Sequence, residues 1–195
     1  MKYFLLLTAI VCFSCATAQE TVRITQIESD DQIIFGYDTV RKYLWGIFIP
    51  FEFKFNNQSS QNLWIGGVDY CVPDEFGPLG QYGGWSAISR KLKINDKYVT
   101  GPYPAEFYKP QYQNPGYYWI GSIREITPES DIQDSLSRYV KRIKPGTRSI
   151  PVGTLREFKS RHPELTERLL GRDSVSFRVY NNNKPVEFIT MPIKY

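Results

Sequence analysis

The sequence is poor in the two side chains that most often carry metal or nucleophilic chemistry. It has one histidine, His162, and three cysteines among 195 residues. Zinc sites are generally built from several imidazole or thiolate ligands, and a catalytic triad needs a histidine beside its nucleophile. Pro163 follows His162 directly, a setting typical of a surface residue where one helix stops and another starts. We therefore expect no metal site, no cofactor and no histidine-based catalytic centre.

Long apolar runs are also absent. A membrane-spanning helix needs roughly 20 apolar residues, whereas the run from Phe4 to Phe13 is about half that length. Lys2 precedes this run and Ala16-Thr17-Ala18 follows it, which is the layout of a secretory signal peptide with its cleavage site. The sequence thus predicts a signal peptide over residues 1–18. The mature chain would begin at Gln19, form a single domain over residues 19–195, and reach the periplasm, the cell surface or the medium.

The cysteines bear on the mode of export and on stability. Cys15 stands near the end of the apolar run, where a lipoprotein carries its acylated cysteine. Cys12 occupies the position three residues earlier, where such a signal has an aliphatic residue. We expect soluble export, with a lipid anchor at Cys15 as the alternative. Only Cys71 would remain after cleavage, so no intrachain disulfide could form, and we expect it to be a buried, unreactive thiol.

Nucleotide- and nucleic-acid-binding signatures are lacking too. Several glycines lie between Gly77 and Gly84, but no Gly-Lys-Ser/Thr occurs anywhere in the chain, as a phosphate-binding P-loop requires. A basic run extends from Arg138 to Arg148. It falls at the end of a predicted helix, where basic side chains complement the helix dipole. We therefore expect no nucleic-acid partner.

Strand patterns occupy most of the remaining chain. Within 43–55, Phe51, Phe53 and Phe55 alternate with charged residues, which places three rings on one face. Pro50 indicates an edge or a bend, and Gly66-Gly67 indicates a bulge. Further strands are predicted near 22–24, 33–35, 63–72 and 117–126. A hairpin turning at 181–184 ends the chain.

Helical spacing is confined to one stretch. Apolar residues from Ile132 to Ile143 recur every three or four positions, with Thr127 as a possible cap and Pro128 in the first turn. Thr154 and Glu157 form a capping-box pattern for a second helix, and Gly171 marks a stop. The sequence predicts an α+β fold of mainly antiparallel β-structure. Its pattern resembles immunoglobulin-like sandwiches or a curled sheet, with a two- to three-helix insert at about 128–170 before the last hairpin.

One segment, from Pro102 to Trp119, combines prolines with aromatic rings. Proline restricts the backbone and tyrosine offers a large apolar face with a polar tip, so such a segment loses little entropy on binding. Because neighbours on a strand point to opposite faces, we expect only one of Tyr117 and Tyr118 to be available for contact. The candidate binding residues are Tyr103, Tyr108, Tyr112, Tyr117, Tyr118 and Trp119.

Three functional hypotheses follow. The first is an exported, non-enzymatic binding or interaction module that contacts a protein or a carbohydrate through this aromatic segment. The second is a small carbohydrate-active hydrolase that uses a carboxylate pair from Asp69, Asp74 and Glu75, since glycosidases work with two such groups. The third is an accessory subunit of a cell-envelope assembly that uses its edge strands.

Overall fold

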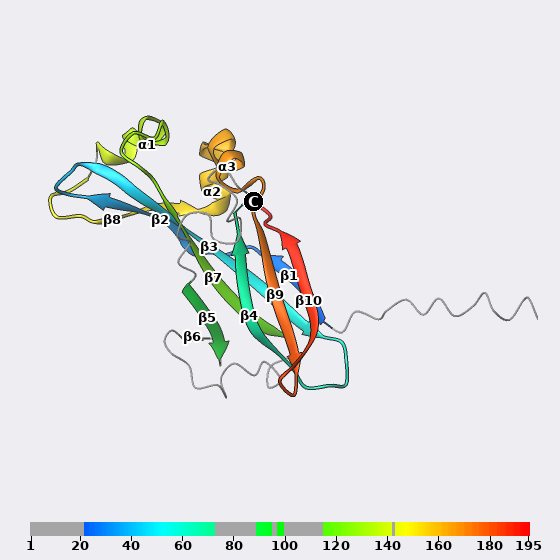
Figure 1. The fold of residues 1–195 in the computed structure, drawn as a ribbon. Helices are drawn as coiled ribbons and strands as arrows, with labels where there is room; N and C mark the ends of the chain where they lie inside the picture. The colour runs from blue at the N-terminus through cyan, green and yellow to red at the C-terminus, as the bar shows by residue number, and fades with distance from the viewer. Residues whose placement is uncertain (1–21, 73–88, 95–96, 100–114, 142) are drawn as a thin grey trace, which may run out of the picture.

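The computed structural model describes residues 22–72, 89–94, 97–99, 115–141 and 143–195. This part of the chain is mostly antiparallel β-structure in two sheets, with three helices (Figure 1). The large sheet contains β1 (Val22–Ile27), β2 (Gln32–Asp38), β3 (Tyr43–Asn57), β5 (Ser89–Ile94), β6 (Lys97–Val99), β7 (Gly116–Glu125) and β8 (Ser149–Thr154). The small sheet contains β4 (Leu63–Cys71), β9 (Ser174–Asn181) and β10 (Lys184–Pro192). The helices are α1 (Ile132–Val140), α2 (Leu155–Arg161) and α3 (Pro163–Leu170). None of these described helices is long and apolar enough to cross a bilayer.

The long strand β3 organises the large sheet, whose order is β6-β5-β7-β3-β2-β8, with β1 also paired to β3. Pro50 lies inside β3 and is opposite Gly121 of β7. On the other side of β3, pairing with β2 stops at Phe48 and pairing with β1 begins at Glu52. Proline is tolerated in this central strand because its missing N–H falls in the gap between β1 and β2.

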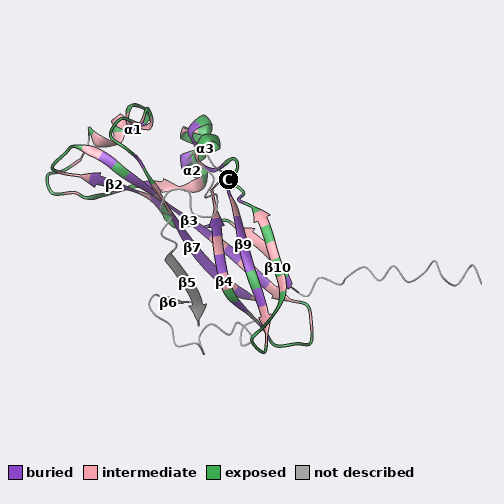
Figure 2. Cartoon of the chain, in the orientation of Figure 1, coloured by how far each residue is buried: buried purple, intermediate pink, exposed green. Residues whose placement is uncertain are grey.

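One face of the large sheet, which we call its inner face, is covered by the small sheet and by the helices. The small sheet packs over one half and the helices lie at the other end, near β2 and β8 (Figures 1 and 2). Phe53 and Phe55 of β3 both contact the ring of Phe177 from β9, with centroids 5.2 Å apart in each case. At the helical end, Phe35 of β2 meets Phe158 of α2 at 5.9 Å. The alternating rings of β3 thus form the core face, as their spacing predicted.

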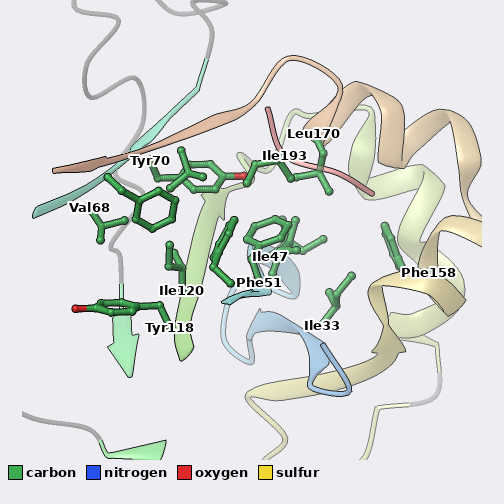
Figure 3. Packing of buried hydrophobic residues seen from close by; sticks show 14 of the residues in the cluster. Ile33, Ile47, Phe51, Val68, Tyr70, Tyr118, Ile120, Phe158, Leu170 and Ile193 are labelled. Carbon is green, nitrogen blue, oxygen red and sulfur yellow. The ribbon is translucent and has the colours of Figure 1, made fainter. Parts of the chain in front are cut away.

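A polar cluster is enclosed within this core. The Tyr70 hydroxyl of β4 donates to Asp173 Oδ2 at 2.6 Å, and Arg124 of β7 pairs with the same oxygen. The Tyr70 ring also stacks on Phe51 of the large sheet, with 5.7 Å between ring centroids. Figure 3 labels both residues within the buried cluster. Burial, and then the negative charge of Asp173, raise the pKa of the Tyr70 phenol well above its ordinary value. The cluster therefore joins the two sheets with a fully protonated tyrosine.

Several local predictions are confirmed. The last hairpin turns on Asn182 and Asn183, which both have positive φ, the geometry of a two-residue hairpin turn. The pairing of β4 with β9 shifts register between Ile65 and Gly67, at the predicted bulge. Thr154 and Glu157 form both bonds of the capping box that starts α2.

Other predictions need correction. Helix α1 begins at Ile132 after Asp131, so neither Thr127 nor Pro128 belongs to it. Those two residues lie in a preceding turn, in which the Ser130 N–H donates to the Thr127 carbonyl at 3.1 Å. Strand β8 interrupts the stretch predicted as a helical insert, because β2 offers it a pairing partner that local periodicity does not reveal.

Candidate functional site

The aromatic segment proposed from the sequence falls largely outside the described residues. Tyr103, Tyr108 and Tyr112 all lie there. Tyr117 is described, and it is half-buried on β7. The idea of a continuous aromatic contact surface on this segment stays a prediction.

Tyr118 and Trp119 are both buried, each only 3% exposed, and this removes them from an exposed contact surface. Tyr118 points into the core, with its ring 5.0 Å from that of Phe55. Trp119 lies on the opposite face of the large sheet beside Phe48, with 5.6 Å between ring centroids. Its indole N–H donates to Asp31 Oδ2 at 2.5 Å. The prediction that neighbouring side chains on this strand point to opposite faces is consistent with these positions. The sequence contained no sign that both faces of β7 are covered here.

Of the three predicted carboxylates only Asp69 is among the described residues, so the carboxylate pair stays a prediction. Asp74 and Glu75 lie outside the described residues. Asp69 accepts a hydrogen bond from Arg178 Nη2 at 2.6 Å, so its charge is already paired on the small sheet. Cys71 is half-buried and not fully buried as predicted, and no metal-binding cluster of His, Cys, Asp or Glu occurs among the described residues.

A hollow of about 780 Å³ lies between α1, the chain that follows it, and β8. We call it the basic groove. Its described lining contains three basic side chains and no carboxylate, and its polar lining residues are Arg138, Tyr139, Lys144, Thr147, Ser149 and Arg161. A positive hollow with hydroxyl groups on its wall suits an anionic ligand that also carries hydrogen-bonding groups.

The fold brings these groups together from separate elements. Arg138 and Tyr139 come from the last turn of α1, and Ser149 begins β8. Tyr139 is anchored by Phe35 of β2, whose ring meets it edge-on at 5.3 Å. Because Phe35 is fully buried in the core, this contact fixes the position of the phenol at the groove wall.

His162 contacts two of the side chains that line the basic groove, Tyr139 and Arg138. Arg138 Nη2 donates to the Nε2 of His162, and the Tyr139 hydroxyl lies 2.9 Å from the same nitrogen. The imidazole ring lies 4.9 Å from that of Phe158. Burial, followed by the charges of Arg138 and Arg161, lowers the pKa of His162. The imidazole is therefore neutral at pH 7, accepts from Arg138, and keeps Tyr139 beside it.

Arg161 is also held in place by hydrogen bonds, in its case to backbone carbonyls. Its Nε donates to the Glu157 carbonyl at 3.0 Å, and its Nη2 donates to the Val152 carbonyl. The guanidinium passes so close to Gly153 that a Cβ there would lie 2.5 Å from Arg161 Nη2, and Gly153 has a φ of +97°. Both the backbone conformation and the close approach require glycine at this position.

A second hollow, of about 350 Å³, differs in its charge balance. It lies between the end of β1, α2 and the last residues of the chain. There Arg156 pairs with Glu28 at 3.1 Å, and Lys159 Nζ donates to a Tyr195 oxygen at 2.6 Å. The described lining of this hollow thus includes a carboxylate, Glu28, that is paired with one of its basic side chains. The described lining of the basic groove includes no carboxylate, although Arg161 lies 4.0 Å from Glu157 outside it.

The signal for the basic groove is present in the sequence as a run of basic residues. The run from Arg138 to Arg148 was assigned to the helix dipole, and Arg138 does lie in the last turn of α1. The convergence of this run with Arg161, some twenty residues later, depends on the β2–β8 pairing. Comparisons of the chain with protein-family models, curated proteins and solved structures find no match.

Proposed function

We propose that this chain is an exported, non-enzymatic binding module, and that the basic groove holds an acidic polysaccharide. The observation that carries the proposal is the meeting of Arg138, Lys144 and Arg161 around one hollow whose described lining has no carboxylate. Glu157 lies outside this lining, with its carboxylate 4.0 Å from Arg161 Nη2. Carboxylates on a ligand would supply the missing negative charge.

The remaining groups in the groove favour a sugar as the carrier of that charge. The half-buried ring of Tyr139 gives an apolar face, and Thr147 and Ser149 supply hydroxyl groups. A second depression, of about 620 Å³, shares Tyr139, Pro151 and Arg161 with the basic groove and adds Arg156, Glu157 and Ser160 to the polar lining. This continuity suits a linear chain of several sugar units better than a single compact anion.

Binding is favoured over catalysis because the candidate acid–base groups among the described residues, His162 and Asp69, are already engaged. His162 Nε2 accepts from Arg138 and lies within hydrogen-bond distance of Tyr139, and Asp69 is paired with Arg178. A general base has to reach a substrate proton with a free acceptor. The engaged groups instead hold the donors of the groove in fixed positions, which reduces the entropy lost on binding.

The proposal includes the finer features that the sequence predicts. The two packed sheets would form a β-sandwich of immunoglobulin-like or curled type. Residues 1–18 would direct export to the periplasm, the cell surface or the medium, with acylation of Cys15 as the alternative to release. The module would then meet its polysaccharide outside the cytoplasm.

A charge-reversal pair tests the groove directly. Lys144 is exposed in the groove, and Lys184 is exposed on the distant β9–β10 hairpin. We expect Lys144→Glu to weaken binding to polygalacturonate about tenfold, the factor to which ~1.4 kcal/mol corresponds. Isothermal titration calorimetry of the mature chain measures it.

Lys184→Glu is the matched control because it changes the net charge by the same amount. Binding through general electrostatic attraction would weaken equally in both variants, and that outcome would contradict the proposal. Absence of polygalacturonate binding by the unaltered protein would also contradict it. Neutral dextran should not bind to either variant or to the parent protein.

A further inference from the structure

Strand β10 presents a bare edge with apolar side chains. Among the described strands it pairs only with β9. Val186 is 46% exposed and Phe188 is 62% exposed, while Ile189 and Met191 pack against the core. An open edge with exposed apolar side chains is a natural site for the addition of another strand.

The hairpin geometry shows which backbone groups face outward. Asn181 and Lys184 flank the two-residue turn and are paired with each other, so they exchange both hydrogen bonds of their pair. The alternation along the ladder then turns the groups of Ile189 toward β9. It turns the N–H and C=O groups of Phe188 and Thr190 away from β9, toward the open edge.

Both ends of this open stretch are closed to pairing. Pro185 and Pro192 lack an N–H, and the register shifts between Pro185 and Glu187. Proline and bulges are the usual means of preventing open-ended growth of a sheet. Here they leave a short window, centred on Ile189, in which a strand of limited length can pair.

We propose that a second copy of this chain occupies the window, with the two β10 strands antiparallel across a twofold axis. Phe188 of each copy would lie opposite Thr190 of the other. In this register each such pair exchanges both of its outward backbone hydrogen bonds. The ring of Phe188 would pack on the Thr190 methyl group and diagonally on the other Phe188.

The composition of the window favours a second copy. The stretch from Phe188 to Pro192 carries no charge, so the twofold axis brings no like charges together at the centre of the contact. The nearest lysines, Lys184 and Lys194, lie outside the window. The same prolines would limit the window in both copies. The two small sheets would then form one continuous sheet across the twofold axis, and the dimer would leave no β10 edge open for a third copy.

Sedimentation of the mature chain over a range of concentrations tests the dimer. The unaltered protein should show a reversible species of twice the monomer mass. Thr190→Pro should give only monomer, because it removes an outward N–H without breaking the bonds to β9. Thr190→Val retains that N–H and loses only the hydroxyl that meets Ser176 at 2.8 Å, so it should still dimerise.

A second variant covers the case in which proline prevents folding. Phe188→Lys keeps the backbone intact and should shift the protein to monomer by placing two charges across the axis. Val40→Lys is its control, since Val40 is 85% exposed and lies outside β10. A protein that is monomeric at every concentration, one that forms open-ended polymers, or a dimer unaffected by Phe188→Lys would overturn the proposal.

Discussion

Two clusters in this molecule are built from the same kinds of group but lie in different surroundings. Each joins a tyrosine hydroxyl and an arginine guanidinium to a third polar residue, Asp173 in one and His162 in the other. The Asp173 side chain is only 2% exposed, whereas Arg138 is exposed beside the basic groove. The inner cluster is enclosed by the two sheets, and the outer one opens to solvent.

Burial decides what each cluster can do. Inside the core, Arg124 and Asp173 must compensate each other, because an unpaired buried charge is costly. Their groups are thereby committed to holding β7, β4 and the start of β9 together. At the groove, both hydrogen bonds of Arg138 to described residues use Nη2, and the guanidinium lies 5.1 Å from the centroid of the Tyr139 ring. A guanidinium carries five N–H donors, so others are available to a ligand. The inner cluster stabilises the fold, and the outer one presents charge.

The largest expected effect comes from breaking the inner cluster. Asp173→Ala would leave Arg124, whose side chain is only 16% exposed, without its partner, and we expect it to lower the free energy of unfolding by about 3–5 kcal/mol. Asp69→Ala breaks the more exposed ion pair with Arg178 and should cost about 1 kcal/mol or less. Urea unfolding of both variants measures the difference. Equal losses would show that burial does not distinguish the two pairs.

Removing the tyrosine hydroxyl from each cluster compares the two with the same substitution, and we expect a smaller difference in stability. Tyr70→Phe removes a buried donor to a carboxylate and should cost about 1.5–3 kcal/mol. Tyr139→Phe removes a hydroxyl from the half-buried ring at the groove and should cost about 1 kcal/mol or less. Thermal and urea unfolding compare the two. A larger loss of unfolding free energy for Tyr139→Phe would contradict the proposal that the inner cluster stabilises the fold and the outer cluster presents charge to a ligand.

The outer cluster alone should respond to mild acid. Because the pKa of His162 is lowered in the folded state, the unfolded chain binds a proton first, and the free energy of unfolding falls as the pH drops below the ordinary histidine value of ~6.5. The stability is present above that value. We expect His162→Gln to reduce the loss measured between about pH 7.5 and about pH 5.5. Identical pH dependence in both proteins would contradict this role of His162.

The smallest effect is expected within the core itself. Ser122 is fully buried, and its hydroxyl has no hydrogen-bond partner among the described residues. Ser122→Ala removes this unsatisfied group without changing the space much, so stability should stay within ~0.5 kcal/mol or rise slightly. A loss of several kcal/mol would show that the hydroxyl is bonded in solution.

Much of the fold follows from local pattern. The alternation of Phe51, Phe53 and Phe55 identified the core face of β3, and the Thr154–Glu157 spacing identified the start of α2. These signals are readable because a strand repeats every two residues and a capping box spans one turn. The start of α1 was misplaced because Pro128 is equally compatible with a turn and with a first helical turn.

The candidate site could not be read in the same way. The basic run near Arg138 was visible, but a helix dipole explains such a run without any ligand. Tyr118 and Trp119 were predicted as contact residues because an aromatic residue in a sequence does not show whether its ring is exposed or buried. Their burial depends on Phe55 and Phe48, which lie some sixty to seventy residues earlier in the chain.

By itself, the sequence determined the alternation of the strands, the capping of α2 and the closing hairpin, because these depend on contacts between near neighbours. Only the tertiary structure decided which charges meet. The pairing of β2 with β8 brings Arg161 to Arg138, and the packing of the sheets brings Arg124 to Asp173. Charge and burial act through distance in space, and residues far apart in the chain acquire a defined distance only when the sheets and helices pack together.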